Sequence, residues 1–183
     1  MEKGKNTNQL NILHFAILNS TSDYAIDFIL QNNINSDYAI LADEQTSGRG
    51  RLNNRVWESP KGNFYCSYII NLKNLNLPIE KTNILTSMVI SILKEFLNKI
   101  TNSDIIKLKI PNDLLINDKK LSGVLIEVYY PYAIIGIGIN LISSPISITT
   151  NIKDEFNILV KSEEIVENLY KELVIGIKEC DYL

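Results

Sequence analysis

Three arginines and one tryptophan gather in a single polar stretch of the sequence, residues 48–63. Guanidinium groups hold phosphate or carboxylate oxygens through paired hydrogen bonds, and the glycines beside them let the backbone approach a ligand closely. The indole of Trp57 offers a flat face against which a base can stack. Ser59-Pro60 and Gly62-Asn63 then predict a turn that leads into the next strand. The stretch therefore indicates a loop that binds an anion or a nucleotide.

Composition and spacing leave two other interpretations of this stretch open. A Gly-Arg-Gly-Arg string is also typical of a solvated surface loop or of an arginine-glycine patch that binds RNA. The formal net charge of −3 and the pI of 5.3 exclude a protein that coats nucleic acid with a basic surface, but they allow a local basic site. Bulk charge therefore does not identify a partner.

The elements that must position this loop follow from hydrophobic periodicity. The 183 residues, 45% of them hydrophobic, suffice for one globular domain with its own core. Apolar runs predict strands at 9–18, 37–42, 64–71, 105–110, 114–116, 122–130 and 132–142. Helical spacing predicts helices after Ser20, over 78–100 as the longest, and over 162–178. This order predicts an α+β fold, with a mixed β-sheet and helices packed on one side.

Six short motifs occur in order between Ser20 and Leu141. They are Ser20-Thr21, Gln45 with Gly48-Arg49-Gly50-Arg51, Trp57-Glu58-Ser59-Pro60-Lys61-Gly62-Asn63, Lys109-Ile110-Pro111-Asn112-Asp113, Lys120-Leu121-Ser122-Gly123-Val124-Leu125-Ile126-Glu127 and Gly136-Ile137-Gly138-Ile139-Asn140. Together these motifs resemble those of the biotin protein ligases, also called biotin acetyl-CoA-carboxylase ligases. The resemblance implies the class II aminoacyl-tRNA synthetase-like fold of the biotin and lipoate ligases.

The resemblance also implies an ATP-dependent, AMP-forming ligase. Such an enzyme uses ATP and Mg²⁺ to convert biotin to biotinyl-5′-AMP. It then transfers biotin to one lysine of the biotin carboxyl carrier protein domain of acetyl-CoA carboxylase or a related carboxylase. Both steps build negative charge near the α-phosphate or the acyl carbonyl, so fixed cations are expected to be the main catalytic groups. On this resemblance we expect Lys109 and Arg51 to be catalytic.

Binding roles follow from the same resemblance. Biotin has an apolar bicycle and tail with a polar ureido group, so its pocket needs a few placed hydrogen-bonding groups. The residues expected to bind biotin are Ser20, Thr21, Gln45, Gly48, Arg49, Lys109, Gly123 and Gly136. Those expected to bind ATP or the adenylate are Arg51, Arg55, Trp57, Lys109 and Asn140. Asp113 is a candidate for contact with Mg²⁺ through water.

Some of these residues also fit structural roles. The Ser20-Thr21 pair suits a helix cap, because a hydroxyl there can accept a hydrogen bond from the first turn. Gly136 and Gly138 suit a β-bulge, and Lys109 alone suits an exposed strand end.

We expect residues 1–183 to form the catalytic domain alone. No helix-turn-helix motif precedes Ser20, so DNA binding is not expected. We also expect the family's small C-terminal β-barrel domain to be absent. No apolar run has the length of a signal peptide core or a membrane span, which predicts a cytoplasmic protein without membrane contact. The resemblance allows a homodimer. The alternatives are a lipoate or octanoate ligase of the same superfamily and a biotin-binding module with weakened catalysis.

Overall fold

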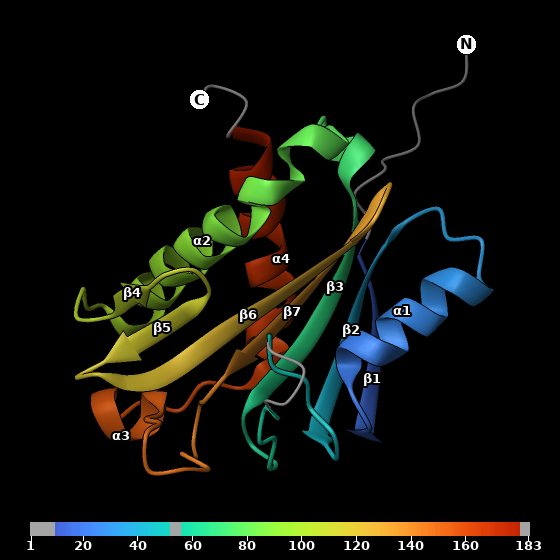
Figure 1. The fold of residues 1–183 in the computed structure, drawn as a ribbon. Coiled ribbons are helices and arrows are strands. Elements are labelled where there is room, and N and C mark those ends of the chain that lie inside the picture. The colour runs from blue at the N-terminus through green and yellow to red at the C-terminus, as the bar shows by residue number, and fades with distance from the viewer. Residues whose placement is uncertain (1–9, 52–55, 180–183) are drawn as a thin grey trace.

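The computed structural model describes residues 10–51 and 56–179 (Figure 1). Within these residues lies one seven-stranded sheet with the strand order β1-β2-β3-β7-β6-β5-β4. The first pair, β1 with β2, is parallel, and every other neighbouring pair is antiparallel. The strands are β1 (Leu10–Leu18), β2 (Asp37–Gln45), β3 (Phe64–Asn71), β4 (Lys107–Lys109), β5 (Asp113–Ile116), β6 (Lys119–Tyr129) and β7 (Tyr132–Ile139). The predicted α+β class and mixed sheet are confirmed.

The described helices are α1 (Thr21–Gln31), α2 (Leu85–Thr101), α3 (Ile152–Phe156) and α4 (Ser162–Glu179), with 3-10 turns at Leu72–Leu75 and Ile79–Ile84. The prediction that the segment after Pro78 forms the longest helix is wrong, because α4 is one residue longer than α2. Residues Ile79–Ile84 of that segment form a 3-10 helix instead, so α2 has 17 residues and α4 has 18. None of these helices combines the length and hydrophobicity of a transmembrane span.

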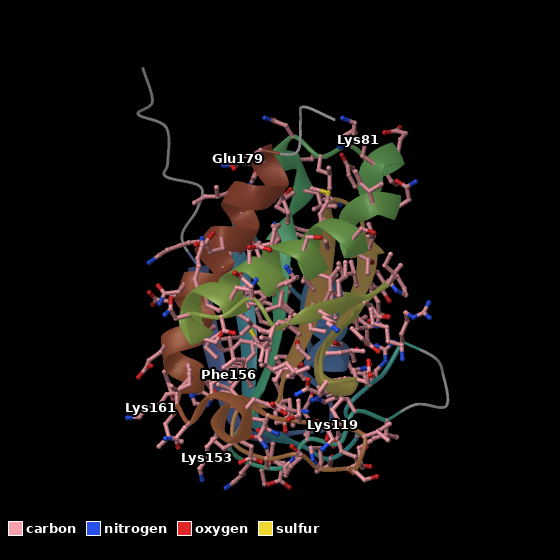
Figure 2. All side chains as sticks on the ribbon, turned by 90° about the vertical axis from the view of Figure 1, so that its left-hand side faces the viewer. Lys81, Lys119, Lys153, Phe156, Lys161 and Glu179 are labelled. Atoms are coloured by element: carbon pink, nitrogen blue, oxygen red, sulfur yellow. The ribbon has the colours of Figure 1, made fainter. Side chains whose placement is uncertain are left out.

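A hydrophobic core lies on each face of the sheet. Alternate residues of a strand point to opposite faces, and in β2 the side chain of Leu41 packs in the larger core with α2 and α4. Its neighbour Ile40 packs in a smaller core with Ala25 of α1. The prediction of helices on one side therefore holds for α2 and α4, which lie over the sheet in Figure 2. It is wrong for α1, which Figure 1 shows on the other face.

The parallel pairing of β1 with β2 explains the position of α1. Two consecutive parallel strands need a crossover connection, which must pass over one face of the sheet. Helix α1 is that crossover, and it leaves β1 through Ser20. The first turn of α1 consequently lies above the end of the sheet where β2, β3 and β7 run side by side.

The predicted hairpin at Asn117-Asp118 is confirmed. Both residues have positive φ angles, 48° and 62°, in the left-handed region that two-residue hairpin turns require. Ile116 pairs with Lys119 across this turn, and Asp113 pairs with Gly123 further along. The hairpin thereby brings the Pro111-Asn112-Asp113 motif beside the first residues of β6.

Candidate active site

Two adjoining pockets lie where the motifs meet. The inner pocket lies beside the start of α1, and its lining includes Thr21, Gln45, Gly123, Gly136 and Gly138. The outer pocket, of about 590 Å³, is lined on one side by the Lys109–Asp113 segment and on the other by Asn140 and residues 145–149. The residues that line both pockets are Gly50, Arg51, Trp57, Asn112 and Lys120. The arrangement therefore provides two binding sites with one shared wall.

The shared wall is built on a pair of glycines. Gly123 of β6 and Gly138 of β7 face each other in the sheet, and the indole of Trp57 lies against both. A Cβ atom on Gly138 would come within 2.5 Å of the Trp57 ring, and one on Gly123 within 2.9 Å. Strand β7 pairs continuously with both neighbours through Gly136 and Gly138, which excludes the β-bulge alternative. These glycines instead allow close approach, and Ser22 covers Gly136 in the same way.

A chain of hydrogen bonds joins three secondary-structure elements to the tryptophan loop. Ser67 Oγ of β3 donates to Thr21 Oγ1 at 2.8 Å, and the Thr21 backbone N–H donates to Gln45 Oε1 at 2.8 Å. Gln45 Nε2 donates to Ser59 Oγ at 2.9 Å, and Ser59 Oγ donates to the Trp57 carbonyl oxygen at 2.7 Å. The chain fixes the wall of the inner pocket. Sequence reasoning missed Ser67, although a small polar residue within an otherwise apolar strand was a signal.

Ser20 and Thr21 divide the two roles predicted for them. Ser20 is 2% exposed, and its Oγ accepts a hydrogen bond from the Asp23 N–H at 3.3 Å, so the cap prediction is confirmed for Ser20. Thr21, one residue later, lines the inner pocket. The helix start therefore supplies one hydroxyl for its own stability and one for the site.

Arg49 links the glycine-arginine loop to two other elements. Its Nη1 and Nη2 each donate to one carboxylate oxygen of Glu127 on β6 at 2.9 Å. Nη1 also donates to Asp23 Oδ1 of α1 at 2.8 Å. The hydrogen bonds to Glu127 and the two negative charges raise the pKa of the Arg49 guanidinium. The side chain thus holds the loop in place while the backbone beside it borders the inner pocket.

Lys120 is, with Arg51, one of two cationic residues in the shared wall. Its Nζ lies 2.7 Å from Asp113 Oδ1 and 4.8 Å from the ring centroid of Trp57, a cation–π distance. The sequence analysis gave Lys120 no role, although it opens the Lys-Leu-Ser-Gly motif. Lys109, the lysine expected to be catalytic, is exposed at the end of β4 and lines the outer pocket. The two lysines therefore reach the site from different sides.

Two polar atoms of the site have neither a hydrogen-bond partner nor an ion-pair partner. Among the described residues, the Nε1 of Trp57 and the Oδ1 of Asn140 are buried and make no hydrogen bond, whereas the buried Oδ1 of Asp113 makes only the ion pair with Lys120. The Asn140 amide nitrogen, by contrast, donates to the carbonyl oxygens of Thr150 at 3.0 Å and Lys120 at 3.3 Å. Leaving a buried polar atom unpaired costs about 1–3 kcal/mol, so both atoms are suited to ligand atoms in the pockets.

The pockets bring together most of the residues predicted from the sequence. Those that line them are Thr21, Gln45, Arg49, Arg51, Trp57, Lys109, Asp113, Gly123, Gly136 and Asn140. Gly48 holds the loop closed, because its carbonyl oxygen accepts a hydrogen bond from the Trp57 N–H at 2.8 Å. Arg55, expected to bind ATP, lies outside the described residues.

Comparison with known proteins identifies relatives of this site. The profile of the Biotin/lipoate A/B protein ligase family matches residues 14–140. The bifunctional ligase/repressor BirA of Bacillus subtilis is 33% identical over 150 residues, which make up 79% of this chain and 44% of BirA. This chain therefore spans less than half the length of that curated relative.

Two solved structures share the fold. The biotin protein ligase of Leishmania major in complex with biotinyl-5-AMP has a TM-score of 0.80 and 27% identity, with 92% of this chain and 75% of that chain covered. The biotin protein ligase of Aquifex aeolicus in complex with biotin and ATP has a TM-score of 0.77 and 30% identity, with 92% and 71% covered.

The close contact at Gly138 yields a prediction that needs no substrate. Gly138→Ala places a methyl group where the indole lies, so Trp57 must move away from the sheet. Because Trp57 is the single tryptophan of the chain, its emission maximum should shift to the red and acrylamide should quench it more strongly. We expect a loss of about 1–3 kcal/mol in the free energy of unfolding.

The matched control is Ile134→Val, on the same face of β7 but in the small core with α1. This control should leave the Trp57 emission unchanged. An unchanged emission in Gly138→Ala would contradict the packing of the indole on the glycine pair.

Proposed function

Because this chain belongs to the biotin/lipoate A/B protein ligase family, we propose that it activates biotin with ATP and transfers it to a lysine of a carrier protein. The observation that carries the proposal is the pair of pockets that meet at Arg51, Trp57 and Lys120. An enzyme that joins an acid to a nucleotide must hold both so that the reacting atoms touch. The relatives described with biotin, ATP and biotinyl-AMP support this assignment.

In the first step a carboxylate oxygen of biotin attacks the α-phosphorus of ATP. The bond from that phosphorus to the oxygen bridging the β-phosphate breaks, and pyrophosphate leaves with the negative charge. Both reactants are anions, so the shared wall must cancel their repulsion. Lys120 and Arg51 are placed to do so, and each such contact contributes about 3 kcal/mol in a water-poor site. Lys109 reaches the phosphates from the outer pocket.

The inner pocket suits biotin. Its glycine floor and the side chain of Leu125 offer apolar surface, and Thr21 and Gln45 supply hydrogen-bonding groups near one end. A polar ureido group and an apolar tail match this distribution. Arg49, which is held by carboxylates, keeps the loop closed over the pocket.

The outer pocket suits the nucleotide. The unpaired Oδ1 of Asn140 can accept a hydrogen bond from the exocyclic amine of adenine, and Trp57 offers an aromatic surface beside it. Pro145, Ile146 and Ile148 add an apolar wall on the far side.

In the second step the acceptor lysine amine attacks the acyl carbonyl of biotinyl-AMP. The amide bond forms, the acyl–phosphate bond breaks, AMP leaves and one proton of the amine passes to water. A deprotonated amine needs no enzyme base, whereas the departing phosphate needs the same cations as the first step. We propose a biotin carboxyl carrier protein domain as the acceptor, with its lysine on an exposed turn.

Magnesium would arrive with ATP. Among the described residues no group of three or more histidines, cysteines, aspartates or glutamates could hold a metal ion, which suits a metal held mainly by phosphates. The Asp113 carboxylate, the candidate for a contact through water, is paired with Lys120. Its part would be to orient that lysine as well as a hydrated ion.

Mass spectrometry tests the proposed activity. The purified protein is mixed with ATP, Mg²⁺ and equal amounts of biotin, lipoate and octanoate, and the acyl-adenylates are measured. We expect biotinyl-AMP alone. Formation of lipoyl- or octanoyl-AMP would show that the protein activates a different acid. A folded sample that binds biotin but forms no adenylate would identify a binding module.

The two lysines should differ in their effect on adenylate formation. Lys120→Met removes the charge but keeps an unbranched side chain over Trp57, and we expect the single-turnover rate to fall about 100-fold or more. Lys109→Met should mainly raise the KM for ATP, by about tenfold, because this lysine reaches only the outer pocket. Biotin binding should persist in both variants.

Lys107→Met is the control, since Lys107 lies exposed two residues from Lys109 on the same strand. Its single-turnover rate and its KM for ATP should equal those of the unmodified protein. A larger rate loss in Lys109→Met than in Lys120→Met would return the main catalytic role to Lys109.

A further inference from the structure

Asn63 ends the tryptophan motif and holds the chain that follows β7. The residue is 1% exposed and is not among those that line the two pockets. Its Oδ1 accepts hydrogen bonds from three consecutive backbone N–H groups, of Leu141 at 2.9 Å, Ile142 at 3.0 Å and Ser143 at 3.2 Å. Its Nδ2 donates to the carbonyl oxygen and the Oγ of Ser143, each at 3.1 Å. One side-chain amide therefore pairs with three backbone N–H groups and one backbone carbonyl of residues 141–143.

Gly62 provides a second, independent contact with this turn. A Cβ atom on Gly62 would come within 2.2 Å of the Ile142 side chain, so the absence of a side chain lets Ile142 pack there. The φ angle of Gly62 is +97°, in a region that residues with a side chain rarely adopt. Gly62 and Asn63 therefore both contact the segment that follows β7.

The segment held by Asn63 forms the far wall of the outer pocket. Asn140, Pro145, Ile146, Ile148 and Thr149 all line that pocket. The other end of the segment is tied to β6, because the Lys120 N–H donates to the Ile148 carbonyl and the Thr150 N–H donates to the Lys120 carbonyl, both at 2.9 Å. Asn63 and Lys120 therefore fix the two ends of one wall.

We propose that Asn63 is a positioning residue for the nucleotide site. By holding residues 141–143 it sets the distance between the far wall and the shared wall, and so the fit of the nucleotide in the outer pocket. The inner pocket is lined mainly by α1, β2 and the glycine floor, whereas the hydrogen bonds of the Asn63 amide go to residues 141–143. The proposal rests on the proposed function in one respect, namely that the outer pocket takes ATP.

Two substitutions separate the acceptor from the donor half of the amide. Asn63→Ala leaves three backbone N–H groups without their acceptor, and we expect the KM for ATP to rise about tenfold while the Kd for biotin changes less than about twofold. Asn63→Asp keeps an oxygen for the three N–H groups, and its second oxygen can accept a hydrogen bond from the Ser143 hydroxyl. It loses the bond to the Ser143 carbonyl, which then faces an oxygen. It should restore most of the ATP affinity.

Ser162→Ala is the matched control. The Ser162 hydroxyl donates to the backbone carbonyl of Asn63 at 3.3 Å, whereas residues 141–143 are held by the side-chain amide. This variant should leave the KM for ATP and the Kd for biotin unchanged. Amide hydrogen exchange should be faster at residues 141–143 in Asn63→Ala and unchanged there in Ser162→Ala.

The outcomes distinguish this inference from the proposed function. If the unmodified protein forms no adenylate, the proposed function fails, and the inference is then decided by the Kd for ATP measured by calorimetry. Equal losses of ATP and biotin affinity in Asn63→Ala, an unchanged ATP affinity, or no ATP binding by the unmodified protein would each overturn the inference. Selective loss of ATP affinity, rescued in Asn63→Asp, would support it.

Discussion

The contact between Trp57 and the glycine pair of β6 and β7 is the constraint on which the site depends. The indole can lie against the sheet only because Gly123 and Gly138 face each other there, and that requires the register of both strands. Lys120 lies over the ring, and the chain of hydrogen bonds from Ser67 ends at the Trp57 carbonyl. A shift of either strand by one residue would turn the glycines to the opposite face and remove the shared wall.

Neighbouring residues of the loop perform different tasks. Arg49 is held by Glu127 and Asp23, whereas Arg51 lines both pockets. The tryptophan motif works in the same way, with Trp57 in the shared wall and Asn63 behind the far wall. The Arg49 guanidinium and the Asn63 amide, which hold parts of the scaffold, make their hydrogen bonds within the protein. Trp57 and Asn140, which line the pockets, each carry one buried polar atom that makes no hydrogen bond among the described residues, as expected of groups that pair with a ligand.

Local patterns predicted the elements well, because strand alternation, helix caps and turn residues act over a few positions. The bounds of β3 and the hairpin at Asn117-Asp118 follow from such patterns. The face on which α1 lies could not be predicted, because it depends on the parallel pairing of β1 with β2, whose paired residues are 27 positions apart in the sequence, as Leu10 and Asp37 are. The same holds for Lys120. Only the antiparallel pairing of β5 with β6 places its ammonium beside Asp113 and over Trp57, whereas Lys109 has the more conspicuous motif.

We propose that one ligand occupies both pockets across the shared wall. Calorimetry with a stable biotinyl-AMP analogue, whose acyl phosphate is replaced by an unreactive linkage, tests this directly. We expect the analogue to bind far more tightly than biotin or AMP alone, and biotin and ATP each to compete with it. Competition with only one of them, or binding no tighter than that of biotin, would show that the two pockets do not form one site.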